Sequence, residues 1–389
     1  MVAVPRTGWV KPVSDRRLSD LVAVGLLTQV FPPALVNEVI AQTGHTERRS
    51  RLLPARSMAY FVIGMGLYAD GSYEEVWGQM ADGLSWVSGG RENLTLPSKS
   101  AIFQARHRLG PEPLEALFAR VAKPLGTART AGAWLAGRRL VAVDDTYLDL
   151  QDTPLNVAFF GRPGVGKDGK PRLPQARLVA LAECGTQVIF DAVVGACTSS
   201  EVALATELIE RLEPGMLLLA DRATCSYRLW QSSFGTGADL LWRVKTGLSP
   251  KYLETLGDGS WLAVIHPAVD DQSESITLRV IDCPVGDGTD DLVSYQLFTS
   301  ILDTAQASAD DLIGAYDQRW RISLTLDELT THQRGARRVL RSKSPELVLQ
   351  EIWGYLCCHY AIRTLMTGAA THSSRTTQRT SAPSLRPLL

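Results

Sequence analysis

The sequence predicts an α/β protein with a helical N-terminal region, a mixed sheet with flanking helices, and a β-rich insertion. Three observations support this prediction. The residues up to about position 125 show helical periodicity and few strand signals. From residue 139 onward, three strand patterns precede an alternation of helix and strand. Residues 251–302 then alternate short strand-like pieces with turns rich in Asp and Gly, which predicts an insertion at about residues 246–304.

The N-terminal region is expected to form compact helices. Residues 55–68 are an apolar segment after Pro54, and Ser98 can cap a helix that continues to about Leu109. The basic residues of that helix are Lys99, Arg106, His107 and Arg108. They indicate either a DNA-binding face or a solvated helix edge, and the sequence favours neither interpretation.

The elements after residue 139 follow an order that only a few topologies accommodate. The expected strands are residues 140–143, 174–182, 187–195, 216–220 and 239–244, and the expected helices are residues 199–212 and 226–234. A three-stranded meander followed by helix–strand units gives a mixed sheet with helices on its faces. This order is typical of the ribonuclease H fold.

Helical periodicity returns near the C-terminus. One helix is expected at residues 308–329 and a second at residues 344–366, with Pro345 at its first helical position. Residues 367–389 are rich in Ser, Thr and Pro and contain three Arg but no acidic residue. This composition predicts a disordered tail.

Composition restricts the class of protein. Of the 389 residues, 45% are hydrophobic and 21% are charged, as in globular proteins with a sizeable core. The net charge of −1 gives no global basic field, so any DNA contact must come from local patches. The six cysteines form no CxxC pair or zinc-spaced cluster, and no secretory leader or membrane-length apolar segment is present. We therefore expect a cytoplasmic location and no membrane partner.

Two aspartates follow buried strands of the predicted sheet. Asp144 follows residues 140–143, and Asp221 follows residues 216–220. Carboxylates at the carboxyl ends of adjacent strands can bridge two Mg²⁺ or Mn²⁺ ions for phosphoryl transfer. The alternative is that each aspartate caps the turn after its strand, which is common in α/β proteins.

Polar residues form a stripe along the helix expected at residues 308–329. At about 100° per residue, four polar residues lie beside an apolar face, where their side chains can point into a cleft. They are Tyr316, Arg319, Ser323 and Thr330. An ordinary amphipathic helix explains the same spacing. A basic run follows, which either neutralises DNA phosphates or forms a solvated loop. Its members are His332, Arg334, Arg337, Arg338, Arg341 and Lys343.

Residues 161–167 match a phosphate-binding loop in spacing only. The pattern G-x-x-x-x-G-K is present, but Asp168 stands where a Ser or Thr must hold magnesium. Pro171 and Pro174 also interrupt the helix that such a loop requires. We therefore do not expect an ATP site here.

Several segments resemble the DDE transposases of the insertion-sequence-four family, which carry the signature Y-x-x-R-x-x-x-E-x-x-x-x-x-x-K. The similar segments are YDQRWRI from residue 316, LRSKSPELV from residue 340, QEIWG from residue 350, VDDT from residue 143 and LADR from residue 219. Residues 53–56 and 97–100 are similar to the N-terminal domain of that family, so the resemblance extends from about residue 15 to 366. It implies a DNA-binding domain at residues 1–130 and a catalytic domain at residues 131–366.

The resemblance also implies roles for single residues. Asp144 and Asp221 would bind the metal, Tyr316 and Arg319 would contact the backbone of the element end, and Trp320 would stack on an unpaired base. Arg222, Ser226 and Thr330 are also expected to contact DNA, and the basic run adds the candidates Arg334, Arg337, Arg338, Arg341 and Lys343. The expected partners are double-stranded DNA, comprising terminal inverted repeats and target, and a second copy of the chain in a synaptic complex. The implied reaction is cut-and-paste transposition of a bacterial insertion sequence, by strand cleavage and transfer with two metal ions.

The chain departs from the family signature at two positions. Ser323 stands at the position of the Glu and cannot supply a carboxylate, and Thr330 stands at the position of the Lys. Asp327 and Glu328 lie elsewhere on the helix and are not expected to replace the Glu. Two hypotheses follow, an active transposase and a catalytically silent DNA-binding remnant. The change of composition near Thr367 further suggests a frameshift, which the other reading frames of the gene would reveal.

Overall fold

The computed structural model describes ten stretches of the chain: residues 25–49, 51, 53–87, 97–165, 171–221, 226–244, 250–267, 274–285, 293–332 and 339–380. The chain forms two compact units. The first comprises Met1–Phe118 and Gln350–Ala361, and the second comprises Ala119–Leu349 and Ile362–Leu389. The segment Gln350–Ala361 thus groups with the N-terminal helices, although the sequence predicts it within the domain at residues 131–366.

The first unit is helical, as the periodicity indicates. Its helices are α2 (Pro33–Gln42), α3 (Ala55–Leu67), α4 (Tyr73–Val87), α5 (Lys99–Leu109), α6 (Glu112–Val121) and the middle of α12 (Pro345–Thr380). The centre of α3 is buried, and α12 lies directly against it. A Cβ atom added to Gly354 would come within 2.7 Å of Val62 Cγ1, so glycine permits this close approach.

The basic residues of α5 are largely engaged within the first unit. Arg106 is fully buried and donates hydrogen bonds to Gln350 Oε1 at 2.8 Å and to the Tyr73 hydroxyl at 2.7 Å. Arg108 lies 3.6 Å from a carboxylate oxygen of Glu47. Arg106 therefore fits neither a DNA-binding face nor a solvated helix edge, because it is buried and stabilises the first unit.

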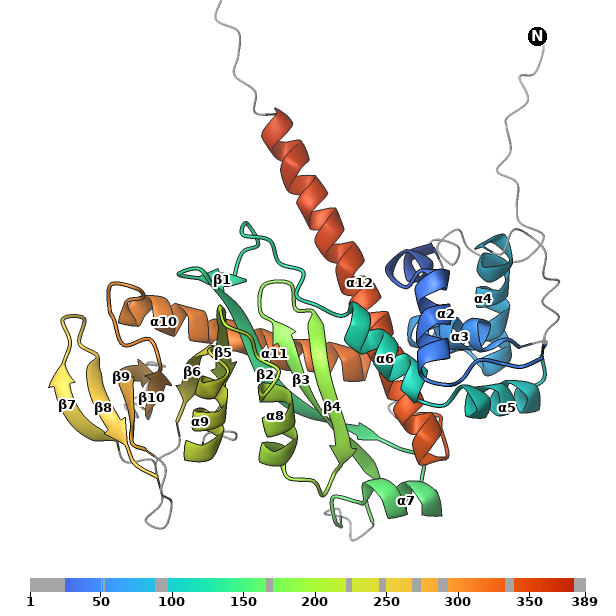
Figure 1. The fold of residues 1–389 in the computed structure, drawn as a ribbon, viewed down its shortest axis with the longest axis horizontal. Helices are drawn as coiled ribbons and strands as arrows, with labels where there is room; N and C mark the ends of the chain where they lie inside the picture. The colour runs from blue at the N-terminus through green and yellow to red at the C-terminus, as the bar shows by residue number, and fades with distance from the viewer. Residues whose placement is uncertain are drawn as a thin grey trace, which may run out of the picture. The chain divides into compact units, whose positions relative to one another are not determined.

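The second unit contains the predicted mixed sheet (Figure 1). The strands are β1 (Trp134–Leu135), β2 (Arg138–Asp149), β3 (Gln175–Glu183), β4 (Ile189–Ala196), β5 (Met216–Ala220), β6 (Asp239–Arg243), β7 (Lys251–Thr255), β8 (Trp261–Ile265), β9 (Ile276–Val285) and β10 (Val293–Thr299). Their order is β4-β3-β2-β5-β6-β10-β9-β8-β7, with β1 paired to β2. The antiparallel meander of β2 to β4 and the parallel strands β5 and β6 confirm the ribonuclease H-like prediction.

The β-rich insertion extends this sheet. Strand β10 pairs antiparallel with β6, and β9, β8 and β7 follow outward. A buried ion pair links the insertion to the helix that comes next in the chain. Arg279 is fully buried and contacts Asp258, and the same carboxylate accepts a hydrogen bond from Ala309 N at 2.8 Å. The insertion therefore fixes the first turn of α10 (Ala309–Tyr316).

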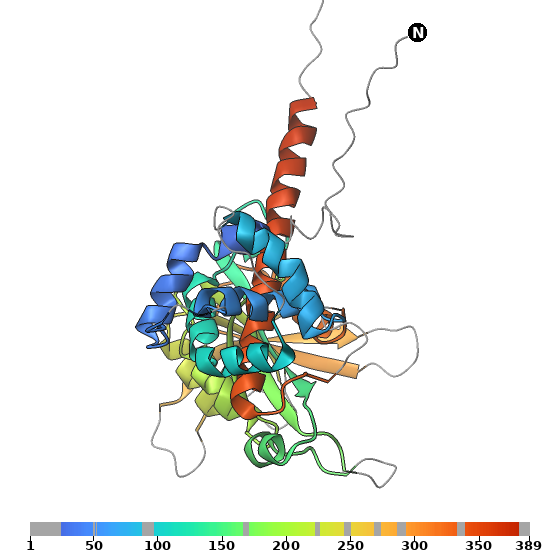
Figure 2. The same ribbon diagram turned by 90° about the vertical axis from the view of Figure 1, so that its right-hand side faces the viewer.

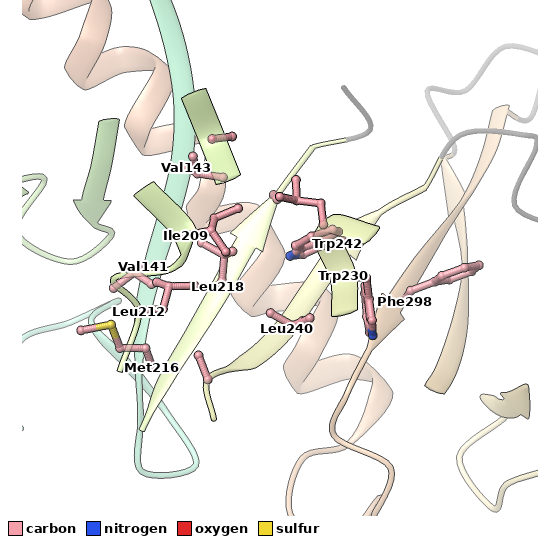
Figure 3. Close-up of a cluster of buried hydrophobic side chains, with 14 of the residues drawn as sticks. Val141, Val143, Ile209, Leu212, Met216, Leu218, Trp230, Leu240, Trp242 and Phe298 are labelled. Carbon is pink, nitrogen blue, oxygen red and sulfur yellow. The ribbon is translucent and has the colours of Figure 1, made fainter. Parts of the chain in front are cut away.

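Helices cover both faces of the sheet. On one face, α8 (Glu201–Ile209) and α9 (Tyr227–Gly235) enclose a hydrophobic cluster that includes Val141, Leu218 and Trp242 (Figure 3). On the other face, α11 (Trp320–Asp327) packs against β2. A short helix, α7 (Pro154–Phe160), was not expected from the sequence, and Thr153 caps it by accepting a hydrogen bond from Asn156 N.

The helix expected at residues 308–329 is interrupted. Helix α10 begins with a capping box formed by Ser308 and Asp311, and it is followed by a 3₁₀ turn at Asp317–Arg319, by α11, and by a π turn at Glu328–His332. The predicted apolar face is nevertheless buried throughout. Its members are Leu312, Ala315, Ile322, Leu326 and Leu329.

The last helix is longer than expected. The sequence predicts an end near Met366, whereas α12 continues to Thr380 (Figure 2). No proline occurs between Pro345 and Pro383, so no residue in this segment lacks the backbone donor that a helix needs. The rest of the expected tail, residues 381–389, lies outside the described residues. Within the described stretches, no helix is both long and apolar enough to cross a bilayer.

Candidate active site

The two candidate aspartates lie side by side because of the register between β2 and β5. Ala142 pairs with Leu219 in this parallel ladder. Asp144 lies two residues after Ala142 and Asp221 lies two residues after Leu219, so the two aspartates reach the same level of the sheet. The sequence predicts that the strand ends at Asp144, but in the structure it does not. β2 continues to Asp149 because β3 pairs with it along this length, while β5 stops at Ala220. This leaves one edge of β2 open beside Asp144.

Alternation along the strands decides which way each acidic side chain points. Val141 and Val143 belong to the cluster under α8 and α9, so Asp145 points to that face and Asp144 points to the opposite one. Leu218 and Ala220 belong to the same cluster, which places Asp221 on the face of Asp144. The neighbouring Asp145 accepts a hydrogen bond from Arg177 at 2.8 Å and takes no part in the pair.

Arg319 and Ser323 face the two carboxylates from the 3₁₀ turn and α11. Arg319 Nη1 lies 3.9 Å from Asp144 Oδ2, and Arg319 Nη2 lies 3.7 Å from Asp221 Oδ2. The Arg319 side chain is only 8% exposed. Ser323 donates a hydrogen bond of 2.5 Å from Oγ to Asp144 Oδ2. The polar stripe expected from the sequence thus converges on the two aspartates at these two positions.

Aromatic rings surround the guanidinium of Arg319. Its Cζ atom lies 5.7 Å from the ring centroid of Tyr316 and 5.8 Å from that of Trp320. Tyr316 is buried, its hydroxyl donates to Ala220 O at 3.4 Å, and burial raises the pKa of its phenol well above the usual range. The Trp320 side chain is 64% exposed, so one wall of the site faces solvent.

Two residues beside this group were not predicted from the sequence. The ring centroid of Tyr295 in β10 lies 6.3 Å from that of Tyr316, with the two rings tilted, and Arg243 at the end of β6 lies 4.6 Å from the ring centroid of Tyr295. Arg243 could have been predicted from the sequence, because it lies at the carboxyl end of the strand next to β5, where α/β sheets place functional residues. Tyr295 gave no such signal, because only the pairing of β10 with β6 brings it here.

Comparison with known proteins agrees with this architecture. The family description "Transposase DDE domain" matches residues 135–361, and "Insertion element 4 transposase N-terminal" matches residues 21–119. The chain belongs to the DDE transposases of the insertion-sequence-four family. Transposase InsG for insertion sequence element IS4 of Escherichia coli (strain K12) is 29% identical over 355 residues, which cover 89% of this chain and 77% of the relative.

Two further proteins are similar to this transposase. The putative transposase InsZ of Escherichia coli (strain K12) is 24% identical over 209 residues, which cover 54% of this chain and 67% of the relative. Among solved structures, a piggyBac transposase synaptic complex with hairpin DNA, determined by cryo-electron microscopy, has a TM-score of 0.45 and 11% identity. That likeness covers 94% of this chain and 83% of the other.

The donor atoms of the site fit a single hard cation. Asp144 and Asp221 supply two carboxylates, and Ser323 adds a neutral hydroxyl. Mg²⁺ is commonly held by one or two carboxylates while it keeps several waters. Among the described residues, no group of three or more His, Cys, Asp or Glu side chains is placed to hold a metal. The third carboxylate of the family signature therefore has no replacement in these stretches.

The nearby acidic residues do not fill that position. The Glu328 carboxylate forms an ion pair with Arg363. Asp327 is exposed, and its backbone carbonyl accepts a hydrogen bond from Thr330 Oγ1 at 3.2 Å. Thr330 therefore contacts its own helix, and no described contact joins it to Asp144 or Asp221.

The other expected DNA-binding residues are spread more widely. Ser226 caps α9 by accepting a hydrogen bond from Leu229 N, which is a structural role. The segment that carries Arg341 and Lys343 is fixed beside α7, because Asn156 Nδ2 donates to Ser342 O. Lys343 is exposed there and Arg341 is half-buried. Several predictions fall on residues outside the described stretches, namely Arg222, Arg334, Arg337 and Arg338.

Proposed function

We propose that this transposase cleaves DNA at the ends of its insertion element and joins the freed ends to target DNA. Asp144 and Asp221 would hold a divalent cation, Mg²⁺ or Mn²⁺, for both steps. The observation that carries this proposal is the convergence of the two carboxylates, from adjacent parallel strands, on one face of the sheet. When bound, the cation supplies positive charge to the attacking and leaving oxygens of an in-line displacement.

The chemistry requires two successive phosphoryl transfers. In cleavage, a water oxygen bonds to phosphorus, the bond between phosphorus and the 3′-oxygen breaks, and that oxygen takes up a proton. In joining, the freed 3′-hydroxyl attacks a phosphorus of the target and displaces a 3′-oxygen there. Tyr316 and Arg319 would orient the element-end backbone, and the exposed ring of Trp320 would stack on an unpaired base. A second copy of the chain would hold the other end.

A catalytically silent DNA-binding protein is the second candidate, and one observation favours it. Ser323 offers Asp144 a neutral hydroxyl in place of a carboxylate, so the site has one negative charge fewer than the family signature provides. A single preorganised electrostatic contact contributes roughly 10²–10³-fold to the rate of an enzyme. We therefore expect cleavage by this copy to be weak.

Cleavage of a DNA duplex that carries the element end tests the proposal. The end sequence is taken from inverted repeats that flank the gene, and cleavage is followed on gels in Mg²⁺ and in Mn²⁺. Activity that disappears in Asp144→Ala and persists in Asp145→Asn would support it. Asp145 is a matched control, because it is the adjacent residue on the opposite face. Binding of the duplex without cleavage in either ion would support the silent candidate.

Restoration of the family signature provides a stronger test. The double variant Ser323→Glu and Thr330→Lys supplies the missing carboxylate and the missing ammonium group. We expect its cleavage rate to exceed that of the natural chain by about 10²-fold, the scale of one electrostatic contact in an active site. A rate that does not rise would place the defect elsewhere, with the residues after Thr367 as the next region to examine.

A further inference from the structure

Arg319 occupies an unusual electrostatic position within this site. Its guanidinium lies between the two carboxylates of Asp144 and Asp221, and only 8% of its side chain is exposed to solvent. The distances of 3.9 and 3.7 Å exceed those of hydrogen bonds, so the contacts are ionic attractions with no fixed bonding geometry. A positive group thus already lies where the two negative charges converge.

The hydrogen-bonding capacity of this guanidinium is not fully used. Arg319 Nε is buried and has no acceptor among the residues that the structure describes. Ser323 is four residues further along, where a side chain lies on the same face of a helical segment. Its hydroxyl donates to Asp144, and a hydroxyl cannot neutralise the charge of Arg319. A Glu at this position would supply an anionic acceptor for the same group.

The charges of these groups indicate the consequence. Asp144, Asp221 and Arg319 together carry one net negative charge, whereas an additional Glu at position 323 would make it two. A cation beside the carboxylates would therefore meet reduced attraction and, at a short distance, repulsion from Arg319. For the metal to bind, the guanidinium must move away from the carboxylates. If it stays, the affinity of the site for the metal is lower.

We propose that Arg319 is an internal counter-cation that competes with the divalent metal for Asp144 and Asp221. The inference rests on the proposed function, because it takes these two carboxylates as the metal ligands. The competition is expected to be strong because Ser323 offers Arg319 no anionic acceptor that could draw it away from Asp144. In the absence of metal, Arg319 balances part of the charge of the pair.

Titration of the full chain with Mn²⁺ alone, followed by calorimetry and without DNA, tests this inference. Arg319→Gln removes the positive charge and keeps a polar side chain. An opposite or like charge within about 4–6 Å shifts an ionic equilibrium by roughly one to three powers of ten. We therefore expect the Mn²⁺ affinity of Arg319→Gln to exceed that of the natural chain by about tenfold or more.

Two further variants make the comparison specific. Arg321→Gln removes the same charge two residues away, at a half-buried position in α11, and its Mn²⁺ affinity should equal that of the natural chain. Arg319→Met retains a long stem between the rings of Tyr316 and Trp320, and it replaces Arg319→Gln if that variant does not fold. The expected increase in affinity is the same for both substitutions at Arg319.

The possible outcomes separate this inference from the proposed function. Unchanged or weaker Mn²⁺ binding in the Arg319 variants, with binding that is lost in Asp144→Asn, would overturn the competition and leave the metal ligands in place. Equal tightening in Arg321→Gln would also overturn it, because the effect would then reflect net charge alone. If no variant shows Mn²⁺ binding that depends on Asp144, the assignment of the metal ligands fails, and the inference fails with it.

Discussion

Arg177 and Arg319 each lie between two carboxylates, on opposite faces of β2, but their contacts differ. Arg177 donates from Nε to Asp145 at 2.8 Å, from Nη2 to Glu201 at 2.7 Å and from Nη1 to Ser199 O at 3.3 Å. The two ion pairs of Arg319 span 3.7 and 3.9 Å, and its Nε has no acceptor among the described residues. Arg177 is thus hydrogen-bonded to both of its carboxylates in a fixed geometry, whereas the contacts of Arg319 with its two carboxylates are ionic only.

This difference separates a structural ion cluster from a functional one. Charge-assisted hydrogen bonds fix both partners, so the Arg177 cluster holds β2 and the start of α8 together. The contacts of Arg319 leave the carboxylates of Asp144 and Asp221 accessible to another cation or to DNA. Adjacent residues of one strand, Asp144 and Asp145, thus serve different purposes because the strand turns them to opposite faces.

The largest expected effect is the loss of the structural cluster. Arg177→Met leaves two half-buried carboxylates without a counter-ion, and removal of one partner from a buried ion pair costs about 3–5 kcal/mol. Urea unfolding of the metal-free protein measures this cost. Replacement of Asp145 and Glu201 by neutral residues in the same variant should recover much of it. A cost below about 1 kcal/mol would show that the Arg177 cluster does not stabilise the fold.

The same measurement on Arg319→Gln should give a much smaller value. Its ion pairs lack hydrogen-bond geometry, and the Asp144 and Asp221 side chains are 26% and 36% exposed. Partly exposed pairs contribute about 0–1 kcal/mol, so the variant should unfold within about 1 kcal/mol of the natural chain in metal-free buffer. A loss comparable with that of Arg177→Met would remove the distinction between the two arginines.

The smallest expected effect is the pH dependence of the Arg177 cluster. Burial raises the pKa of Asp145, and burial together with the charge of Asp145 raises the pKa of Glu201. A carboxyl whose pKa is higher in the folded state binds protons more tightly there, so protonation favours folding. Stability relative to Asp145→Asn with Glu201→Gln should therefore rise as pH falls from neutrality toward the ordinary values of 3.8 and 4.5. A fall over this range, in urea unfolding, would contradict the direction of these shifts.

Much of the sheet could be predicted from local pattern. The continuous apolar run Met216–Ala220 is fully buried as β5, and the meander of β2, β3 and β4 follows the expected order. The cap at Ser98 and the capping box at Ser308 also start their helices where expected. These features depend on residues close in sequence, whose periodicity and capping groups are visible without the fold.

Features that depend on distant partners could not be predicted in the same way. Arg106 looks like a surface residue of a basic helix, but Gln350 and Tyr73 accept its hydrogen bonds inside the first unit. The interruption of the helix after Tyr316 also left no clear sequence signal, because neither Gly nor Pro occurs at its turns. Burial and ion pairing are decided by groups that the chain brings together only when it folds.

The sequence by itself determined the fold class, the two aspartates at neighbouring strands and the family, because these reside in local periodicity and in short motifs. Only the tertiary structure decided that Asp144 and Asp145 face opposite layers and that Ser323, 179 residues away, donates to Asp144. It also decided that Arg319 lies between the metal-binding candidates. The physical reason is that the role of a charged side chain depends on its burial and on the groups around it. Those groups come from distant parts of the chain and meet only in the folded protein.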